Sequence, residues 1–515
     1  VLSAGSPRVS RRVMLVPFLS ILAVTHPSSH DYGIIIDAGS TGSRIHLFHW
    51  PKRIFYARQW PFILGGHLSI PEEIASFTVK PGLSAFAGGR EREAGASLQP
   101  LLDSASQVLL GMDPPVALNK VALFLGATGG CRLLSDDTLH LIMGSVREVI
   151  FASPFDRKYV GRARVLSGEE EGVFGWLAVN AGRGTITSEK NATLGVVDLG
   201  GASSQITFIP TMTSIKANLF PMHFGDFLTN GPIHVYSHSY LGFGYVTAFQ
   251  RVSAALSVTS PNTSEFVSPC LPRGVSWQVS APGYGISVRR EVTRTGGPIS
   301  MTGSGDFDWC HNAARALLPS GPCFFNGQCS FLGQYQPPMD ELKFAAIGEF
   351  QATFQAVGAP SGSSLEELRD MAERFCALPY AEQGAELNGT QFGGDKAPLL
   401  CWSLVWTLTL LVDGFQLPWD SRALVWDSDL WGGAADWARG QMLYEVNFFP
   451  WEVKGVTQDE QLVPVVRASD APFPASLVWV PSGISLLLVA ALLGRWWERR
   501  IRWSEAQSDG GYAVF

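Results

Sequence analysis

Two stretches of this sequence repeat one design, a short apolar strand followed by an aspartate and a loop of small residues. The first, YGIIIDAGSTGSRIHLF, spans 32–48, and the second, ATLGVVDLGGASSQITFI, spans 192–209. The β-branched residues before each aspartate favour a buried strand, and Asp37 and Asp198 lie 198 − 37 = 161 positions apart. Small residues let backbone N–H groups approach an anion closely. Because two ordinary Gly/Ser turns would rarely share this chemistry, the repeat predicts a duplicated phosphate-binding loop.

Two further segments place small or acidic residues directly after a short strand. KVALFLGATGGCRLL (120–134) predicts a buried strand, a glycine-rich loop and a helix. ARVLSGEEEGVFGWLAVN (163–180) predicts a strand, a tight turn with three glutamates, and a helix. RIHLFHW (44–50) alternates like the returning strand of a hairpin, and SASQVLLGM (104–112) predicts a helix. We therefore expect an α/β fold.

The charge of the chain argues against a nucleic-acid polymer as its partner. The 515 residues carry a formal net charge of -7, and no basic cluster dominates the sequence. A protein that binds a nucleic-acid polymer needs a concentrated positive surface. The length allows two or three domains with sizeable cores.

A membrane anchor is expected near the C-terminus. ASLVWVPSGISLLLVAALLG (475–494) contains no charged side chain, and at about 1.5 Å per residue it reaches roughly 30 Å, the thickness of a bilayer core. A polar stem at 454–474 precedes it and arginines follow it at once. The positive-inside tendency then predicts a cytosolic tail at 495–515 and a lumenal or extracellular ectodomain. Cell surface, Golgi and other endomembranes all stay open as locations.

The N-terminal segment 1–29 is expected to be a signal peptide or the remnant of an N-terminal anchor. Arginines precede VMLVPFLSILAV (13–24), whose length suits a signal-peptide core better than a membrane span. The sequence begins with Val1 rather than Met, so both interpretations stay open.

Cysteine usage agrees with a translocated chain. Six of the seven cysteines lie between 270 and 401, and none has the paired short spacing of a zinc site. An even set in such a chain indicates disulfides, which leaves Cys131 over. Glycosylation sequons at Asn191, Asn262 and Asn388 point in the same direction.

In order along the chain, these loops resemble the apyrase signature regions of the ectonucleoside triphosphate diphosphohydrolases. The matching blocks are DAGSTGSR (37–44), LGATGGCRLL (125–134), LSGEEEGVFGW (166–176), DLGGASSQITF (198–208) and a degenerate fifth, DWARGQMLYEVNFFP (436–450). Blocks such as VYSHSYLGFG (235–244) and FLGQYQPP (331–338) also look like the family. One such loop is weak support, whereas five blocks in order, covering 32–452, are strong support.

The resemblance implies an α/β fold with two RNase H-like lobes, as in actin and sugar kinases, and an interlobe cleft for the nucleotide. Residues 30–165 would form lobe I, completed by 440–453, and residues 166–439 would form lobe II. A C-terminal transmembrane helix follows the ectodomain.

The same resemblance implies three disulfides, Cys323–Cys329, Cys376–Cys401 and, with those assigned, Cys270–Cys310. Cys131 stands where the family usually has methionine, which favours a free, packed thiol over a catalytic one because no activating base is evident.

The activity that the resemblance implies is hydrolysis of nucleoside tri- and diphosphates with a divalent cation. The phosphate- and nucleotide-binding residues would be Ser40, Thr41, Gly42, Ser43, Arg44, Thr128, Gly129, Gly200, Gly201 and Ala202. Asp37 and Asp198 would hold Mg²⁺ or Ca²⁺ largely through water, because these hard cations prefer oxygen ligands. Arg44 could equally be a structural ion-pair partner.

A water molecule is the expected nucleophile, since no residue is placed to form a covalent intermediate. Its base must be a carboxylate or histidine within reach. By resemblance the base is Glu171, while Glu169 and Glu170 are solvated or structural. Ser203 and Gln205 would orient the water. Arg132 could contact phosphate or form a structural ion pair.

Recognition of the nucleobase is where the resemblance weakens. The family follows its QPP block with a tyrosine-rich segment, and this chain has FAAIGEFQATF (344–354) there. Phe350 or Phe354 could take over base stacking. The preferred base, the preference for di- or triphosphates and the oligomeric state stay open, and a homo-oligomer is compatible with the sequence.

Three other interpretations fit the sequence less well. An exopolyphosphatase-like phosphatase has similar loops, but the blocks after residue 235 and the anchor argue against it. A cytosolic chaperone-type or sugar-kinase ATPase is opposed by the sequons and the cysteines. A non-catalytic nucleotide-binding membrane protein would be expected to lose Glu171, Ser203 or Gln205, and all three are present.

Overall fold

The computed structural model describes residues between His30 and Lys454, with gaps. The described ranges are 30–52, 55–56, 69–157, 162–186, 192–211, 215–222, 233–259, 265–279, 299–386, 394–432, 435–448 and 453–454. The expected N-terminal segment 1–29, the stem beyond Lys454, the membrane span, the tail and the asparagines of all three sequons lie outside these residues.

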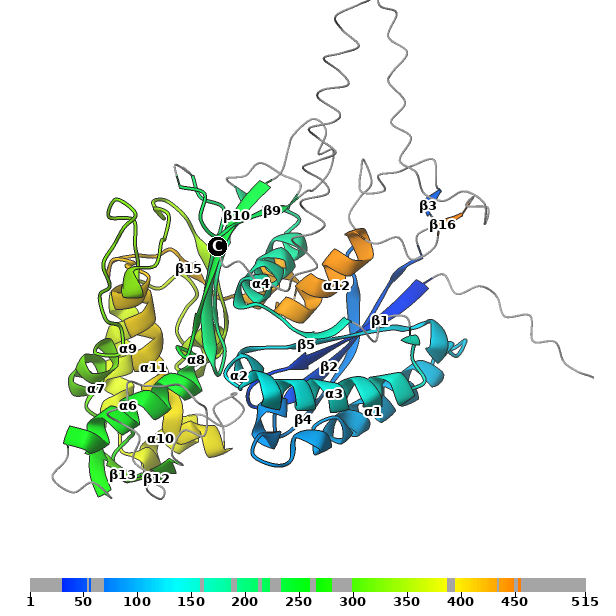
Figure 1. Cartoon of the computed structure of the whole chain (residues 1–515). Coiled ribbons are helices and arrows are strands. Elements are labelled where there is room, and N and C mark those ends of the chain that lie inside the picture. The colour runs from blue at the N-terminus through cyan, green and yellow to red at the C-terminus, as the bar shows by residue number, and fades with distance from the viewer. Residues whose placement is uncertain are drawn as a thin grey trace, which may run out of the picture. The chain divides into compact units, whose positions relative to one another are not determined.

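A five-stranded mixed sheet, in the order β4-β2-β1-β5-β6, forms around the first aspartate loop (Figure 1). β1 (His30–Ala38) pairs antiparallel with β2 (Ser43–Pro51) and parallel with β5 (Ala122–Ala127). β4 (Glu72–Val79) and β6 (Ala163–Val165) are the edge strands. The hairpin expected after the first loop is therefore confirmed.

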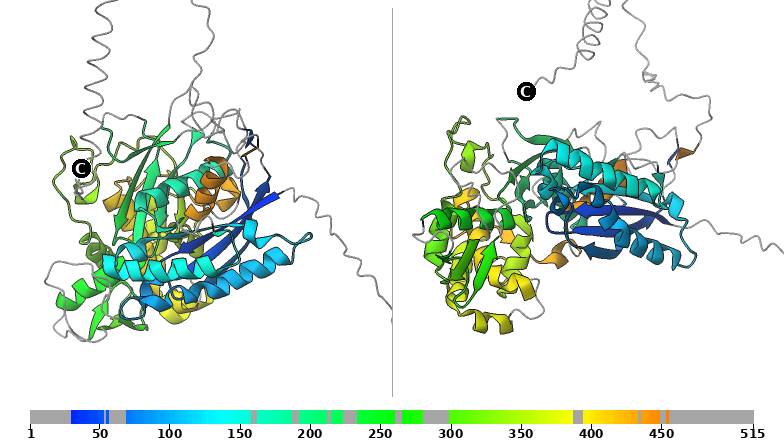
Figure 2. Two further views of the ribbon diagram at one scale, coloured as in Figure 1. Left: turned by 45° about the vertical axis from the view of Figure 1, so that its right-hand side comes forward. Right: turned by 60° about the horizontal axis from the view of Figure 1, so that its bottom comes forward.

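Two helices, α1 (Gln99–Leu110) and α3 (Asp136–Ala152), cover one face of this sheet, as Figure 2 shows. Because side chains alternate along a strand, Ile34 and Ile36 pack beneath these helices, whereas Ile35 joins a core on the opposite face. α1 includes most of the segment that was expected to be helical.

A six-stranded sheet, in the order β15-β14-β7-β8-β10-β9, forms around the second aspartate loop. Its strands are β7 (Gly195–Leu199), β8 (Ser203–Phe208), β9 (Leu219–Met222), β10 (Ile233–Leu241), β14 (Phe344–Gly348) and β15 (Leu424–Val425). β7 pairs antiparallel with β8 and parallel with β14. It therefore repeats the position of β1 between an antiparallel and a parallel neighbour.

The core behind the second loop is rich in aromatic side chains. α8 (Glu349–Ala356), α9 (Leu365–Ala377) and α11 (Leu400–Thr409) contribute to it. Trp402 and Trp406 are fully buried, and their ring centroids lie 5.4 Å apart. Full burial of a large apolar side chain contributes about 1.5–3 kcal/mol, so this core fixes the strand from which the second loop emerges.

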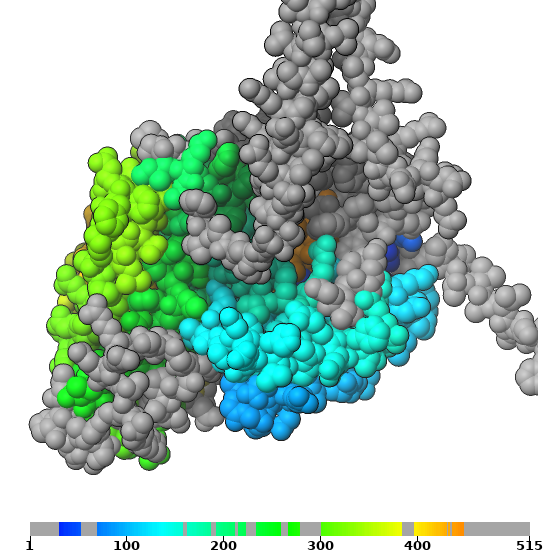
Figure 3. Space-filling view, in the orientation of Figure 1, coloured from blue at the N-terminus to red at the C-terminus, as the bar shows by residue number. Residues whose placement is uncertain are grey.

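Two further helices connect the parts built on the two sheets. α4 (Gly168–Gly182) and α12 (Trp437–Phe448) pack against each other, α12 against β1, and α4 against β7, β8 and β10. Phe174 of α4 belongs to a core of the first sheet, whereas Trp176 belongs to a core of the second. In Figure 3 the blue-to-cyan surface of α1 and α3 adjoins the green surface of the second part.

Several further elements lie in the described chain. They are α2 (Gly129–Arg132), α6 (Tyr245–Thr259), α7 (Phe307–Arg315), α10 (Tyr380–Glu386), a small sheet of β11 (Glu265–Ser268), β13 (Ile299–Gly303) and β12 (Ser276–Val279), and the pair β3 (Phe55–Tyr56) and β16 (Val453–Lys454).

The cysteines are arranged as the resemblance implies. The structure contains the disulfides Cys270–Cys310, Cys323–Cys329 and Cys376–Cys401. Cys131 is a free, buried thiol, and burial raises its pKa to about 12. A thiol with so high a pKa stays protonated and is a poor nucleophile.

One segment of the described chain, Lys396–Gly414, is long and apolar enough to cross a membrane. It is also 83% buried inside the protein, mainly as α11 in the aromatic core. Core helices meet the same criteria of length and composition, so this segment is weak support for a membrane span.

Candidate active site

The two aspartate loops meet at one cavity of about 460 Å³. Asp37 near the end of β1, Asp198 in β7 and Glu171 in α4 all line it. Small residues complete its wall: Gly39, Ser40, Thr41 and Gly42 from the first loop, Gly200, Gly201, Ala202 and Ser203 from the second, and Thr128 and Gly129 from the segment after β5.

Close contact between the loops depends on two glycines. A Cβ atom at Gly201 would lie 2.3 Å from the Ser40 hydroxyl oxygen. A Cβ atom at Gly129 would lie 3.0 Å from both the Ala202 methyl group and the Ser203 hydroxyl oxygen. Larger side chains here would push the loops apart, so glycine keeps their backbones close enough to surround one ligand.

Glu171 lies in the first turn of α4, whereas the sequence predicted that the glutamates would sit in a turn before the helix. The difference arises from a capping box, because Ser167 Oγ accepts from Glu170 N–H at 3.1 Å and the Glu170 carboxylate accepts from Ser167 N–H at 3.0 Å. This motif starts the helix at Gly168. Glu170 also accepts two hydrogen bonds from Arg164 at 2.8 Å, which is a structural role.

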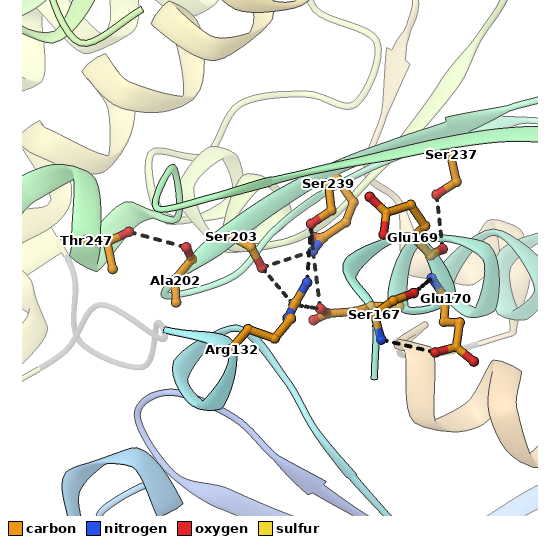
Figure 4. Close-up of polar contacts among 11 residues, drawn as sticks. Arg132, Ser167, Glu169, Glu170, Ala202, Ser203, Ser237, Ser239 and Thr247 are labelled. Carbon is orange, nitrogen blue, oxygen red and sulfur yellow. Dashed lines mark hydrogen bonds and ion pairs between the residues drawn. The ribbon is translucent and has the colours of Figure 1, made fainter. Parts of the chain in front are cut away.

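A network of polar side chains surrounds the Glu171 carboxylate, and Figure 4 labels three of its members, Arg132, Ser203 and Ser239. Arg132 donates to Glu171 and, at 3.2 Å, to Ser203 Oγ. Gln205 Nε2 donates to Glu171 at 3.2 Å and to Ser203 at 3.0 Å. Ser239 Oγ accepts from Gln205 at 3.1 Å and from Arg132 at 3.4 Å. The network fixes the orientation of the carboxylate, and Arg132 takes part as an ion-pair partner.

Three acids line this cavity, Glu171 buried and Asp37 and Asp198 partly buried, and removal from water raises the pKa of each. The pKa of Asp37 rises to about 7 and that of Asp198 to about 8, mainly through burial, with neighbouring acids, Glu171 among them, contributing to both shifts. The pKa of Glu171 also rises, although Arg132 opposes the effect of burial. Within the described residues, Asp37 Oδ1 has no hydrogen-bond partner. Carboxylates so close together favour a bound cation, which would let them ionise together.

Basic side chains line the cavity as well. Arg44 Nε donates to Thr78 Oγ1 at 3.2 Å, and Lys80 follows β4. Lys396 Nζ lies 3.8 Å from the Glu349 carboxylate. A cavity with acids at its base and cations on its wall suits an anionic ligand that carries a divalent cation.

The structure brings the predicted site residues to this cavity, apart from two side chains. Ser43 is fully buried in β2, and Gln205 is 1% exposed beneath Glu171. Both lie on strands directly after their loops, where the pleat turns the side chain inward. Gln205 therefore reaches the cavity through its hydrogen bonds to Glu171 and Ser203.

Sequence reasoning missed several residues of the site. Lys80, Lys396 and Asp436 line the cavity, and Ser239 completes the Glu171 network. Ser239 lies directly opposite Gln205 in the β10–β8 pairing, a relation that no local pattern reveals. Asp436 is the first residue of the fifth block, and its membership of that block was the one sequence signal that could have placed it in the site.

The expectation that Phe350 or Phe354 stacks on the nucleobase is wrong. Both side chains are fully buried in the core behind the second sheet, where Phe354 packs on Trp426 with ring centroids 4.8 Å apart. A side chain with no exposed surface cannot contact a ligand in the cavity.

Comparison with known proteins agrees with this architecture. The sequence model of the GDA1/CD39 (nucleoside phosphatase) family matches residues 23–463. Ectonucleoside triphosphate diphosphohydrolase 2 of Mus musculus is 30% identical, over 84% of this chain and 86% of that protein. Probable apyrase 4 of Arabidopsis thaliana is also 30% identical, over 81% of this chain and 79% of that protein.

Among solved structures, nucleoside triphosphate hydrolases from Neospora caninum superpose with a TM-score of 0.55 and 17% identity, over 82% of this chain and 93% of that chain. At this identity the likeness establishes the fold, while the family rests on the sequence matches. With its two aspartate loops converging on one cavity and a family match over most of its length, the chain belongs to the GDA1/CD39 (nucleoside phosphatase) family.

Proposed function

We propose that this protein hydrolyses nucleoside tri- and diphosphates and releases the terminal phosphate. The observation that carries the proposal is the convergence of two strand-ended aspartate loops and Glu171 on one cavity. The named relatives, a diphosphohydrolase and a probable apyrase, supply the substrate class. We further propose two lobes, one on each sheet, with the boundaries expected from the sequence.

The phosphate chain would lie between the two loops. Their backbone N–H groups are donors that need not reorganise when charge shifts toward the transferred phosphoryl group. Ser40, Thr41, Ser203 and Thr128 add hydroxyl groups on the cavity wall, and Arg44 adds a positive charge.

The residues present fit a divalent cation held largely through water. Among the described residues, no cluster of three or more His, Cys, Asp or Glu side chains could enclose a metal directly. Asp37 and Asp198 instead line the cavity with their carboxyl groups, and such oxygen groups suit Mg²⁺ or Ca²⁺ that retains water ligands. When bound, such a cation neutralises charge on the phosphate oxygens.

Glu171 would accept the proton of the attacking water. Its raised pKa favours proton acceptance, and Arg132 and Gln205 hold its carboxylate in place. The Ser203 hydroxyl accepts hydrogen bonds from Arg132 and Gln205, so its own proton is free to point to the water. Gln205 would not contact the water itself but would position Glu171 and Ser203 through its hydrogen bonds to them.

We propose that the ectodomain lies in the lumen of an endomembrane or outside the cell, anchored by residues 475–494. Disulfides persist in these oxidising compartments, and the described part of the chain contains three of them.

The test is phosphate release by the full chain in detergent micelles. ATP, ADP, UDP, GDP and inorganic polyphosphate would each be supplied with Mg²⁺, with Ca²⁺ or with EDTA. Glu171→Gln should lower kcat by about 10²–10⁴. The matched control is Glu445→Gln, because Glu445 is another buried acid whose pKa burial raises, paired with Arg162 away from the cavity.

Cation-dependent release from nucleotides, lost in Glu171→Gln and kept in Glu445→Gln, would support the proposal. Release from polyphosphate alone would replace the substrate class. Equal rates in the two variants would remove Glu171 from the mechanism.

A further inference from the structure

Asp436 lies on the acidic side of the cavity and has no role in the reaction proposed above. It directly precedes α12, and its Oδ1 accepts a hydrogen bond from Arg439 N–H at 2.9 Å, as a helix N-cap does. Its Oδ2 lies 3.6 Å from His46 Nε2, which is too far for a hydrogen bond. Because Asp436 lines the cavity with Asp37 and Asp198, Oδ2 retains lone pairs for a donor there.

His46 is a buried imidazole fixed at one end and directed at Asp436 with the other. It is 2% exposed, and its Nδ1 lies 2.9 Å from Glu73 Oε1. Within the described residues its Nε2 has no hydrogen-bond partner. Burial lowers the pKa of His46, but Asp436 and Glu73 raise it above its ordinary value, which favours a positive ring between two carboxylates.

The charge of Asp436 reaches both aspartates at the strand ends. Asp436 lines the same cavity as Asp37 and Asp198, where carboxylates of like charge repel one another. Asp436 therefore adds a third carboxylate to the wall that carries the two metal-binding aspartates, and within the described residues the only polar contact of its Oδ2 is the one with His46, at 3.6 Å. The shared negative charge favours a cation placed within reach of all three aspartates.

Resting on the cation site of the proposed function, we propose that Asp436 is a third carboxylate that accepts hydrogen bonds from the water shell of the divalent cation. His46, anchored by Glu73, positions it. Water ligands of a hard cation are strong donors, and residues that hold them tune the affinity of the metal.

The chain offers a matched control for His46 on the same two strands. His49 of β2 pairs with Glu72 of β4, its Nε2 lying 3.3 Å from the carboxylate. Glu72 is 78% exposed, and neither His49 nor Glu72 lines the cavity. A change at His49 removes the same type of cross-strand pair without touching the site.

The experiment measures Mn²⁺ binding to the full chain in detergent micelles by electron paramagnetic resonance, without nucleotide. Asp436→Asn keeps a good N-cap residue but removes the charge. It should weaken Mn²⁺ binding about tenfold, while the unfolding temperature in EDTA stays equal or rises because repulsion is relieved. His46→Gln should weaken binding by a smaller factor, and His49→Gln should leave it unchanged. In the Asp436→Asn background, His46→Gln should have no further effect.

The outcomes separate this inference from the proposed function. If the unaltered protein binds no Mn²⁺, the cation site itself fails and this inference fails with it. If the unaltered protein and Asp436→Asn bind Mn²⁺ equally, Asp436 is only a helix cap and this inference alone is overturned. Equal effects of His46→Gln and His49→Gln would remove the positioning role of His46. Asp436→Ser, a second N-cap residue, repeats the test if Asp436→Asn does not fold.

Discussion

The two aspartate hairpins share one backbone geometry but carry different side chains at equivalent positions. In the first, Asp37 pairs across the hairpin with Arg44, and in the second, Asp198 pairs with Gln205. The separations are identical, since 44 − 37 = 7 and 205 − 198 = 7. Each first strand also has a parallel neighbour on its other side, β5 or β14. The loops thus belong to two copies of one hairpin motif, which suits binding of an anion near a carboxylate.

The equivalent partners Arg44 and Gln205 differ in charge and in burial. Arg44 is exposed to the cavity and contributes positive charge. Gln205 is neutral, buried and hydrogen-bonded to Glu171 and Ser203. The comparison indicates a division of labour, in which the first hairpin attracts the substrate and the second prepares the attack. Altering the first should change KM, and altering the second should change kcat.

Among changes to the two hairpins themselves, the largest effect is expected for Gln205→Leu. It removes the donor that holds Glu171 and Ser203, and a small misplacement of such groups can lower the rate by about 10²-fold. We expect that loss in kcat with little change in KM, measured by phosphate release. Gln383→Leu is the control, because Gln383 is also buried and donates to the Phe375 carbonyl, away from the cavity. A loss confined to KM would contradict the division of labour.

Asp37→Asn and Asp198→Asn test the feature that the two hairpins share, a carboxylate near the end of the first strand. Each should weaken the apparent affinity for Mg²⁺ by about 10–100-fold, because each removes a carboxylate that holds the cation's waters. Titration of Mg²⁺ in the phosphate-release assay measures this. A large effect in one variant and none in the other would show that a single hairpin holds the cation.

Arg44→Gln makes the first hairpin resemble the second at this position. Loss of a charged hydrogen bond worth about 1.4 kcal/mol is a tenfold change, and we expect it in KM for the nucleotide with kcat nearly unchanged. Arg90→Gln is the control, since Arg90 pairs with Glu93 on the surface. A fall in kcat instead would place Arg44 in the attack step.

The strand-and-loop parts of the site could be predicted from short stretches of sequence. Short apolar strands, aspartates and small loops are encoded within a dozen residues, and these elements form as expected. The glutamates were placed in the wrong element because the strength of the Ser167–Glu170 capping box was not recognised. The disulfides were paired correctly only with the help of a family resemblance.

Contacts between distant segments were beyond such reasoning. Arg132 meets Glu171 across 39 positions, and His46 meets Asp436 across most of the chain. The order of strands and the packing of α4 and α12 create these contacts, and no spacing in the sequence encodes them. The aromatic character of Phe350 and Phe354 suggested ligand stacking, but tertiary packing places both in the core.

The smallest effect is expected at the equivalent serines Ser43 and Ser204, which follow the loops. Both are fully buried, and in the described part of the chain neither hydroxyl has a hydrogen-bond partner. Removing an unpaired buried hydroxyl relieves a desolvation cost, so Ser43→Ala and Ser204→Ala should each change the stability by about 0–1 kcal/mol in the favourable direction. Thermal unfolding of the full chain in EDTA measures this. If one variant is destabilised and the other is not, one hydroxyl has a partner in the working protein, and the two hairpins are equivalent in backbone alone.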